Sequence, residues 1–258
     1  MSLRIADLFS VAGKTALVTG GSRGIGEMIA RGLVENGATV YISSRKADVC
    51  DAIAAELSKI GTCVSLPADL SRMDEIARLA SAFTEREQRL NVLVNNAGAA
   101  WGESFDTFPE KGWDKIVDLN LKTPFFLTQA LIARLEAAAA PLDPARVINI
   151  ASIDGISVPR LENYSYSASK AGFIQLTRHL GQDLAKRGIS VTGIAPGFFP
   201  SQMTSFVLSD DTIRSETPVQ RIGTPEDIAG TVIYLASRAG SFCCGSTITV
   251  DGGLVDAR

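Results

Sequence analysis

Short apolar runs alternate along the chain with longer stretches in which apolar residues recur every three or four positions. The runs are rich in β-branched residues and predict strands at 15–19, 39–43, 63–66, 92–95, 147–150, 190–194 and 247–250. Most are apolar at consecutive positions, as in strands of a parallel sheet that helices cover on both faces. The longer stretches predict helices at 25–36, 47–60, 72–89, 112–139, 166–187 and 225–235.

The alternation of strand and helix never changes to a run of consecutive strands. It therefore predicts an α/β fold with a doubly wound sheet and helices on both faces. A chain of 258 residues is long enough to form one such domain, and no linker or repeat divides it. We expect residues 1–258 to form a single domain.

Composition and charge narrow the classes of function. The formal net charge is −3 and 46% of the residues are hydrophobic, which does not indicate a nucleic-acid partner or an anionic membrane. No apolar run approaches the ~20 residues that span a bilayer, and residues 1–9 lack the apolar core of a secretory signal. We expect a cytoplasmic protein with neither a membrane nor a nucleic-acid partner.

Cysteine and histidine usage predicts no metal site. Cys50, Cys63, Cys243 and Cys244 have no C-x-x-C spacing, and His179 is the single histidine. We expect reduced, mostly buried thiols. His179 lies more than two turns beyond Lys170 on the same predicted helix, so we expect it to pack or to lie at an interface.

Glycines follow the first predicted strand and begin the next helix, in the order T-G-G-S-R-G-I-G over residues 19–26. Glycines let the backbone approach a pyrophosphate, and the free N–H groups of a helix N-terminus face its negative charge. This order of strand, turn and helix predicts a dinucleotide site rather than a simple tight turn. The residues predicted to form it are Gly20, Ser22, Arg23, Gly24, Ile25 and Gly26.

The end of the second predicted strand bears on the choice between NAD and NADP. An NAD site has Asp or Glu there to bind the ribose 2′-hydroxyl, whereas this chain has Ser44, Arg45 and Lys46. An acid would repel a 2′-phosphate, and a guanidinium binds one with paired hydrogen bonds. We predict NADP(H) as the cofactor, with Arg23 as a second cation. The alternative is that Arg45 and Lys46 are a solvated surface pair.

Two further strand ends contribute candidate cofactor residues. Asp69, with Leu70 beside it, follows the third predicted strand and is a candidate acceptor for the adenine amino group. Asn96, Ala97 and Gly98 follow the fourth strand, where small residues let a cofactor pass over the carboxyl edge of the sheet.

Tyr166 and Lys170 are four residues apart on a predicted helix, so both side chains lie on one face. A nearby cation favours the phenolate, and we expect Lys170 to lower the pKa of Tyr166. Tyr166 is then a candidate general acid or base, and Ser152, after the fifth strand, a candidate donor to the same substrate oxygen. Asn120, a polar residue within an apolar helix, is a candidate holder of a water that links Lys170 to solvent. Tyr164 is expected to face elsewhere.

These motifs together resemble the short-chain dehydrogenase/reductase family over nearly the whole chain. They are T-G-x-x-x-G-x-G at 19–26, N-N-A-G at 95–98, Asn120, Ser152, Y-x-x-x-K at 166–170 and P-G at 196–197. Within the family, the chain most resembles NADPH-dependent 3-oxoacyl reductases, in particular those of rhamnolipid pathways. The shared stretches are 20–26, 95–102, 146–150 and 194–197.

The resemblance implies a Rossmann-type sheet of about seven parallel strands, often in a homotetramer or homodimer. It implies that the dinucleotide binds in the half at about 1–150 and the substrate in the half at about 151–258. Ser152 would polarise a carbonyl, Tyr166 would donate a proton, Lys170 would hold the nicotinamide ribose, and Asn120 would support a proton relay. The backbone of Pro196, Gly197 and Phe199 would meet the nicotinamide carboxamide, with help from Ser201.

Candidate substrate residues are mostly apolar, which favours an acyl chain or a bulky cyclic ketone over a sugar. They are Trp101, Ser152, Asp154, Phe198, Met203 and Phe206. The chain departs from the family in its longer gap between Ser152 and Tyr166, and in Phe199, where a smaller aliphatic residue is common.

Three functions stay open on the sequence. The first is NADPH-dependent reduction of a small-molecule ketone to a secondary alcohol. The second is oxidation of a secondary alcohol at the same site, with Tyr166 as the base. The third is a dinucleotide-binding scaffold without chemistry, although such a protein would tolerate loss of Tyr166 or Lys170, and both are present.

Overall fold

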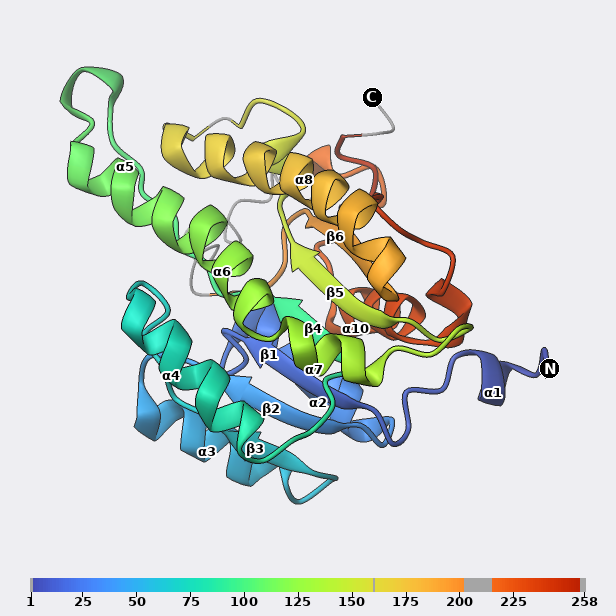
Figure 1. Cartoon of the computed structure of the whole chain (residues 1–258). Coiled ribbons are helices and arrows are strands. Elements are labelled where there is room, and N and C mark those ends of the chain that lie inside the picture. The colour runs from blue at the N-terminus through green and yellow to red at the C-terminus, as the bar shows by residue number, and fades with distance from the viewer. Residues whose placement is uncertain (1, 160, 202–214, 256–258) are drawn as a thin grey trace.

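A seven-stranded sheet with all strands parallel runs through the molecule, in the order β3-β2-β1-β4-β5-β6-β7. The computed structural model describes residues 2–159, 161–201 and 215–255 (Figure 1). The strand order reverses direction between β1 and β4, which is the point where ligands bind in doubly wound sheets. The predicted α/β fold with a Rossmann-type sheet is confirmed.

The strands lie close to their predicted positions. They are β1 (Thr15–Thr19), β2 (Thr39–Ser43), β3 (Cys63–Ser65), β4 (Val92–Asn95), β5 (Ala145–Ile150), β6 (Ile189–Pro196) and β7 (Thr247–Val250). Every residue of β5 and β6 is buried, because helices cover these central strands on both faces.

Helices and helical turns connect the strands. The α-helices are α1 (Ile5–Leu8), α2 (Gly24–Glu35), α3 (Ala47–Leu57), α4 (Met73–Thr84), α5 (Glu110–Val117), α6 (Thr123–Ala130), α7 (Ile132–Ala138), α8 (Tyr164–Leu184) and α10 (Pro225–Ala236). The shorter turns are η1 (Phe105–Thr107), η2 (Asp118–Lys122), η3 (Ile153–Gly155), η4 (Ala185–Arg187) and η5 (Arg238–Gly240). No helix within the described residues is both long enough and apolar enough to cross a membrane.

Two apolar cores lie on opposite faces of the sheet, and alternate residues of a strand belong to different cores. Ala16 and Val18 of β1 pack with residues of α2, α3 and α10, whereas Leu17 packs with residues of α4, α6 and α8. This division explains why the strands are apolar at consecutive positions.

The helix predicted over 112–139 is helical over most of that range, but it is not one regular α-helix. It is divided into α5, the π-helical turn η2, α6 and α7. Pro124, at the start of α6, has no N–H group to continue the ladder of hydrogen bonds. Asn120 lies within the π-helical turn, a local irregularity that often occurs at functional sites.

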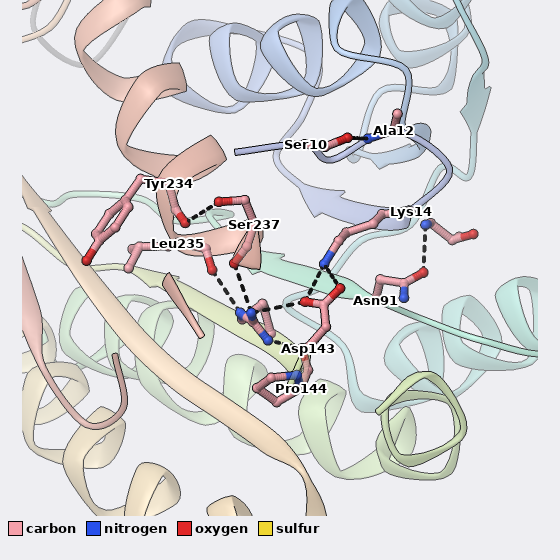
Figure 2. A network of polar contacts seen from close by, with 11 residues as sticks. Ser10, Ala12, Lys14, Asn91, Asp143, Pro144, Tyr234, Leu235 and Ser237 are labelled. Carbon is pink, nitrogen blue, oxygen red and sulfur yellow. Dashed lines mark hydrogen bonds and ion pairs between the residues drawn. The ribbon is translucent and has the colours of Figure 1, made fainter. Parts of the chain in front are cut away.

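A buried arginine anchors the start of β5. Arg146 is fully buried, and its guanidinium donates hydrogen bonds to the backbone oxygens of Leu235 and Ser237, each at 2.9 Å, at the end of α10 (Figure 2). It also donates to the carbonyl of Pro144 and to Asp143 Oδ1, the latter at 3.2 Å. Burial lowers the pKa of Arg146, and the charge of Asp143 opposes this shift.

The same carboxylate accepts two hydrogen bonds of 2.7 Å from Nζ of Lys14, just before β1. The amino ends of β1 and β5 are therefore tied to one turn at the edge of the sheet opposite the strands' carboxyl ends (Figure 2).

We predict that Arg146→Met lowers the free energy of unfolding by about 3 kcal/mol, because it leaves buried carbonyl oxygens and one face of a carboxylate without donors. Chemical denaturation of the purified variant measures this change. Arg187→Met is the matched control, because its ion pair with Glu136 is exposed and should leave the unfolding midpoint unchanged. Equal midpoints for both variants would contradict the anchoring role of Arg146.

Candidate active site

A cleft of about 550 Å³ lies at the carboxyl ends of the strands. Its size is typical of a site for a small molecule or cofactor. Residues from the ends of β1, β2, β4, β5 and β6 line it, together with the first turns of α2 and α8. The lining residues include Gly20, Ser22, Arg23, Ile25, Gly26, Ser44, Arg45, Leu70, Asn96, Ala97, Gly98, Ser152, Tyr166, Lys170, Pro196, Gly197, Phe199 and Ser201.

The glycine turn packs directly against the end of β4. A Cβ atom added to Gly26 would overlap the backbone oxygen of Gly20 and the side-chain nitrogen of Asn96, so no other residue fits here. Asn96 Nδ2 donates to the backbone oxygens of Thr19 (2.9 Å) and Gly20 (3.3 Å). This packing leaves an open cradle at the N-terminus of α2, where free N–H groups favour an anion. Gly24, also predicted for this site, lies against Ser201.

The second strand ends in exposed cations. Arg45 and Lys46 are exposed and line the cleft. In the described part of the chain, neither forms an ion pair. Their charges therefore face the cleft without a carboxylate to neutralise them, as binding of an additional phosphate requires.

Ser152, Tyr166 and Lys170 come together in the cleft, although Ser152 lies in a different segment of the chain. Ser152 follows β5 and begins η3, whereas the other two lie on the first turns of α8. Lys170 is 4% exposed, and its Nζ lies 5.7 Å from the centre of the Tyr166 ring. Nζ donates a 2.7 Å hydrogen bond to the backbone oxygen of Ile150, which ties α8 to the end of β5.

Burial governs the acidity of both groups. It raises the pKa of Tyr166 to about 12, although the Ser152 hydroxyl opposes the rise, so the expected lowering of this pKa is wrong: burial outweighs any stabilisation of the phenolate. Burial lowers the pKa of Lys170 to about 8, and the charge of Asp154 opposes that change. At neutral pH the phenol is therefore protonated and the amine is mostly charged.

Asn120 is buried behind the cleft and its amide is fully engaged. Its Oδ1 accepts from the N–H of Ala99 (3.0 Å), and its Nδ2 donates to the carbonyl of Ala99 (2.9 Å) and to Ser169 Oγ (3.1 Å). The side chain thus connects η2 to the loop after β4 and to α8.

Some predicted residues lie beside the cleft rather than in its wall. The Asp69 carboxylate accepts hydrogen bonds from the backbone N–H and hydroxyl of Ser71, at 3.2 and 2.8 Å. Trp101 is half-buried, with Nζ of Lys115 5.5 Å from its ring centre. Phe198 lines a neighbouring cavity of about 340 Å³.

Asp154 accepts a hydrogen bond from Asn163 and is absent from the cleft wall. Met203 and Phe206, also predicted for the substrate, lie outside the described residues. So does most of the segment 198–218.

The cleft also has lining residues that sequence reasoning missed. They are Ser43, Val49, Ala68, Leu119, Ile150 and Ala151. Ser43 and Ile150 are the last residues of their strands, so they could have been predicted from the sequence as residues at the edge of the sheet that forms the cleft. Leu119 had no such signal, because it reaches the cleft from the π-helical turn.

Several known proteins resemble this chain over most of its length. A family model described as enoyl-(acyl carrier protein) reductase matches residues 20–255. The rhamnolipids biosynthesis 3-oxoacyl-[acyl-carrier-protein] reductase of Pseudomonas aeruginosa is 45% identical over 249 residues, which cover 95% of this chain and 97% of that protein. Gluconate 5-dehydrogenase of Gluconobacter oxydans is 33% identical over 256 residues, covering 96% and 97%.

Among solved structures, the Pseudomonas aeruginosa RhlG/NADP active-site complex superposes with a TM-score of 0.93 at 45% identity, covering 96% of this chain and 98% of that one. No group of metal-ligating side chains occurs within residues 2–159, 161–201 and 215–255. The matches extend over the cleft and over the whole sheet. We conclude that the chain belongs to the short-chain dehydrogenase/reductase family, whose members are oxidoreductases of alcohol and carbonyl groups.

Proposed function

We propose that this protein is a cytoplasmic, NADPH-dependent reductase that converts a ketone to a secondary alcohol. The observation that carries the proposal is that Ser152, Tyr166 and Lys170 line the same cleft as the glycine turn and Arg45. A proton donor and a dinucleotide cradle in one cleft suit hydride transfer at a carbonyl carbon. In this proposal residues 1–258 act as one domain, with both halves contributing to the site.

The residues of the cleft fit NADP(H). Gly26 keeps the cradle open for the pyrophosphate at the start of α2, and Arg45 and Lys46 suit the 2′-phosphate. Lys170 would hold the nicotinamide ribose, and the backbone from Pro196 onward would meet the carboxamide. When bound, NADPH supplies the hydride that adds to the carbonyl carbon. The RhlG/NADP complex, similar over nearly its whole length, supports this choice of cofactor.

The chain's own residues then act on the carbonyl oxygen. Ser152 donates a hydrogen bond to that oxygen and stabilises the negative charge that develops on it. Tyr166 transfers its proton to the same oxygen, which completes the alcohol and leaves a phenolate. Lys170, with its buried charge nearby, stabilises this phenolate. Asn120 would support reprotonation by fixing the surrounding backbone.

The proposed direction rests on the cofactor, and the proposed substrate class on a relative. A phenol whose pKa is raised to about 12 is protonated at neutral pH, as the proton donor of a reduction must be, and the choice of NADPH leans the same way. The three converging side chains disfavour a scaffold without chemistry. The similarity to a 3-oxoacyl-[acyl-carrier-protein] reductase favours a 3-oxoacyl-type ketone, with a bulky apolar or cyclic ketone as the alternative.

We predict that Tyr166→Phe lowers the rate of ketone reduction by about 10³-fold, because it removes the proton donor without changing the shape of the ring. The measurement is loss of NADPH absorbance with a panel of 3-oxoacyl thioesters, diketones and cyclic ketones. NADPH binding, followed by fluorescence, should persist. Tyr164→Phe is the matched control, because this ring packs against Phe105 and Phe108 and should leave the rate unchanged. A fully active Tyr166→Phe enzyme would exclude Tyr166 as the donor.

We predict that Arg45→Asp lowers the preference for NADPH over NADH by roughly 30-fold or more, because a charge-assisted contact is replaced by repulsion. The ratio of kcat/KM for the two cofactors measures this preference. Arg89→Asp makes the same charge change at an exposed position before β4, near the opposite edge of the sheet, and should leave the ratio unchanged. An unaltered ratio in Arg45→Asp would show that another group selects the cofactor.

We also propose a homo-oligomer, a homotetramer or homodimer. Its support is a hollow between η2, α6 and α8, whose apolar lining is Leu121, Phe125, Phe126 and Leu176. Lys122, Gln175 and His179 also line it. Sedimentation should give a multiple of the 27.3 kDa chain mass, and Phe125→Glu should shift the protein toward the monomer. A wild-type protein that sediments as a monomer at micromolar concentration would contradict this proposal.

A further inference from the structure

The short turn η3 packs directly on the helix that carries Tyr166 and Lys170. A Cβ atom added to Gly155 would lie 2.6 Å from the carbonyl carbon of Lys170 and 2.7 Å from the nitrogen of Ala171. The contact between η3 and α8 therefore leaves no room for a side chain at this position. As a result, Asp154, the preceding residue, is held beside the reacting groups.

Asp154 connects the two elements through both its backbone and its side chain. Its N–H donates to Ser152 Oγ (3.1 Å), and its Oδ2 accepts from Asn163 Nδ2 (3.1 Å). Asn163 directly precedes α8, and its backbone oxygen accepts the N–H groups of Tyr166 (2.9 Å) and Ser167 (3.1 Å). A continuous chain of hydrogen bonds thus runs from Ser152 to the turn of α8 that carries Tyr166.

The side-chain amide of Asn163 is oriented by its hydrogen bond to Asp154. Asn163 is 6% exposed, and its Oδ1 has no hydrogen-bond donor among the residues the structure describes. A buried acceptor without a donor costs stability. The amide keeps its Nδ2 on Asp154 all the same, because an amide oxygen facing a carboxylate would be repelled. The carboxylate of Asp154 therefore determines how the amide is oriented.

We propose that Asp154 is a positioning residue of the reduction, which holds the Ser152 turn against the start of α8 through Asn163. It fixes the separation of Ser152 and Tyr166 without touching the substrate, since it does not line the cleft. This inference rests on the proposed reductase function and extends it to a residue behind the reacting groups.

The charge of Asp154 adds a second effect. Together with burial it raises the pKa of Tyr166, and it opposes the lowering of the pKa of Lys170. Both effects keep protons on the two groups at neutral pH. Strand β6, also packed on α8, carries no charged residue. The charged residues of α5 and η2 lie at exposed or half-exposed positions and are Glu110, Lys111, Asp114, Lys115, Asp118 and Lys122.

Two substitutions of Asp154 distinguish the effect of its hydrogen bond to Asn163 from the effect of its negative charge. Asp154→Ala removes the acceptor and the charge, whereas Asp154→Asn keeps an acceptor of the same size and removes only the charge. The rates are measured with NADPH and whichever of acetoacetyl-CoA, ethyl acetoacetate and 2-decalone the wild type reduces fastest. Asp114→Asn, an exposed acid on α5, is the control for loss of one negative charge.

We expect Asp154→Ala to lower kcat by about 10- to 100-fold with NADPH affinity unchanged, because misplaced reacting groups lose rate rather than cofactor binding. Asp154→Asn should recover most of kcat. Its pH profile should fall at a lower pH than that of the wild type, because Tyr166 loses the negative charge that opposes its ionisation. Asp114→Asn should match the wild type in both respects.

A double-mutant cycle tests the link itself. If Asp154 and Asn163 act as one unit, Asp154→Ala with Asn163→Ala should cost no more rate than either single change. The same cycle, measured by unfolding of the cofactor-free protein, should give a coupling energy different from zero. The unfolding measurement does not depend on turnover. It therefore tests the contact between Asp154 and Asn163 even if the protein reduces none of the ketones.

The proposal is overturned by a wild-type kcat in Asp154→Ala, by additive effects in both cycles, or by an Asp154→Asn enzyme as impaired as Asp154→Ala. If Asp154→Ala does not fold, the pH profile of Asp154→Asn decides, and an unshifted profile contradicts the electrostatic effect. If the proposed reductase function itself is wrong, the wild type oxidises no NADPH with any of the three ketones. This result differs from every outcome that contradicts the role of Asp154.

Discussion

All strands of the sheet run in the same direction, so their last residues gather at one edge. This constraint brings together Thr19, Asn96, Ser152 and Pro196, which are far apart in the sequence. Because helices cover both faces, that edge is where backbone and polar side chains can meet a ligand. The hydroxyl of Thr19 stabilises the arrangement, since it donates to the carbonyl of Val94 (3.2 Å) and accepts from the N–H groups of Asn96 (2.9 Å) and Ala97 (3.0 Å).

The same burial that builds the core also sets the chemistry of the cleft. It acts on Tyr166 and Lys170 in opposite senses, because it disfavours the anion of one and the cation of the other. The phenol holds its proton more firmly, while the amine stays mostly charged near neutral pH. The two groups are therefore in the protonation states that proton donation requires. Screening by water is weak there, so the charge of Asp154 also acts on both groups, although less than burial does.

Much of the fold was predictable because it depends on local patterns. Consecutive apolar residues indicated the strands, and four of the seven, such as β1 and β2, have the predicted bounds. The glycine turn, Arg45, Ser152, Tyr166 and Lys170 were likewise found from their positions at strand ends and helix starts, and all line one cleft. Strand ends were informative because a parallel sheet brings them together whatever their distance in sequence.

The features that could not be predicted depend on contacts between distant segments. Nothing local indicates that Arg146 is fully buried, since its partners Leu235 and Ser237 lie about ninety residues away in the chain. Asn120, in the π-helical turn, likewise has its partners Ala99 and Ser169 in distant segments. The pKa of Tyr166 was expected to move in the wrong direction because spacing reveals a neighbouring cation but not the depth of burial.

Strand β5 connects the two halves of the site, because it is fixed at both ends by buried cations. At its start, Arg146 binds the carbonyls at the end of α10, and at its end the carbonyl of Ile150 accepts from Lys170 on α8. Helix α10 packs closely on α2, since a Cβ atom at Gly32 would lie 2.6 Å from that of Ala229. The cradle at the start of α2 and the side chains of Tyr166 and Lys170 on α8 are thus held through one strand. Buried cations cost stability when compared with apolar side chains, but they fix distances between rigid elements, and the hydride transfer that we propose depends on those distances.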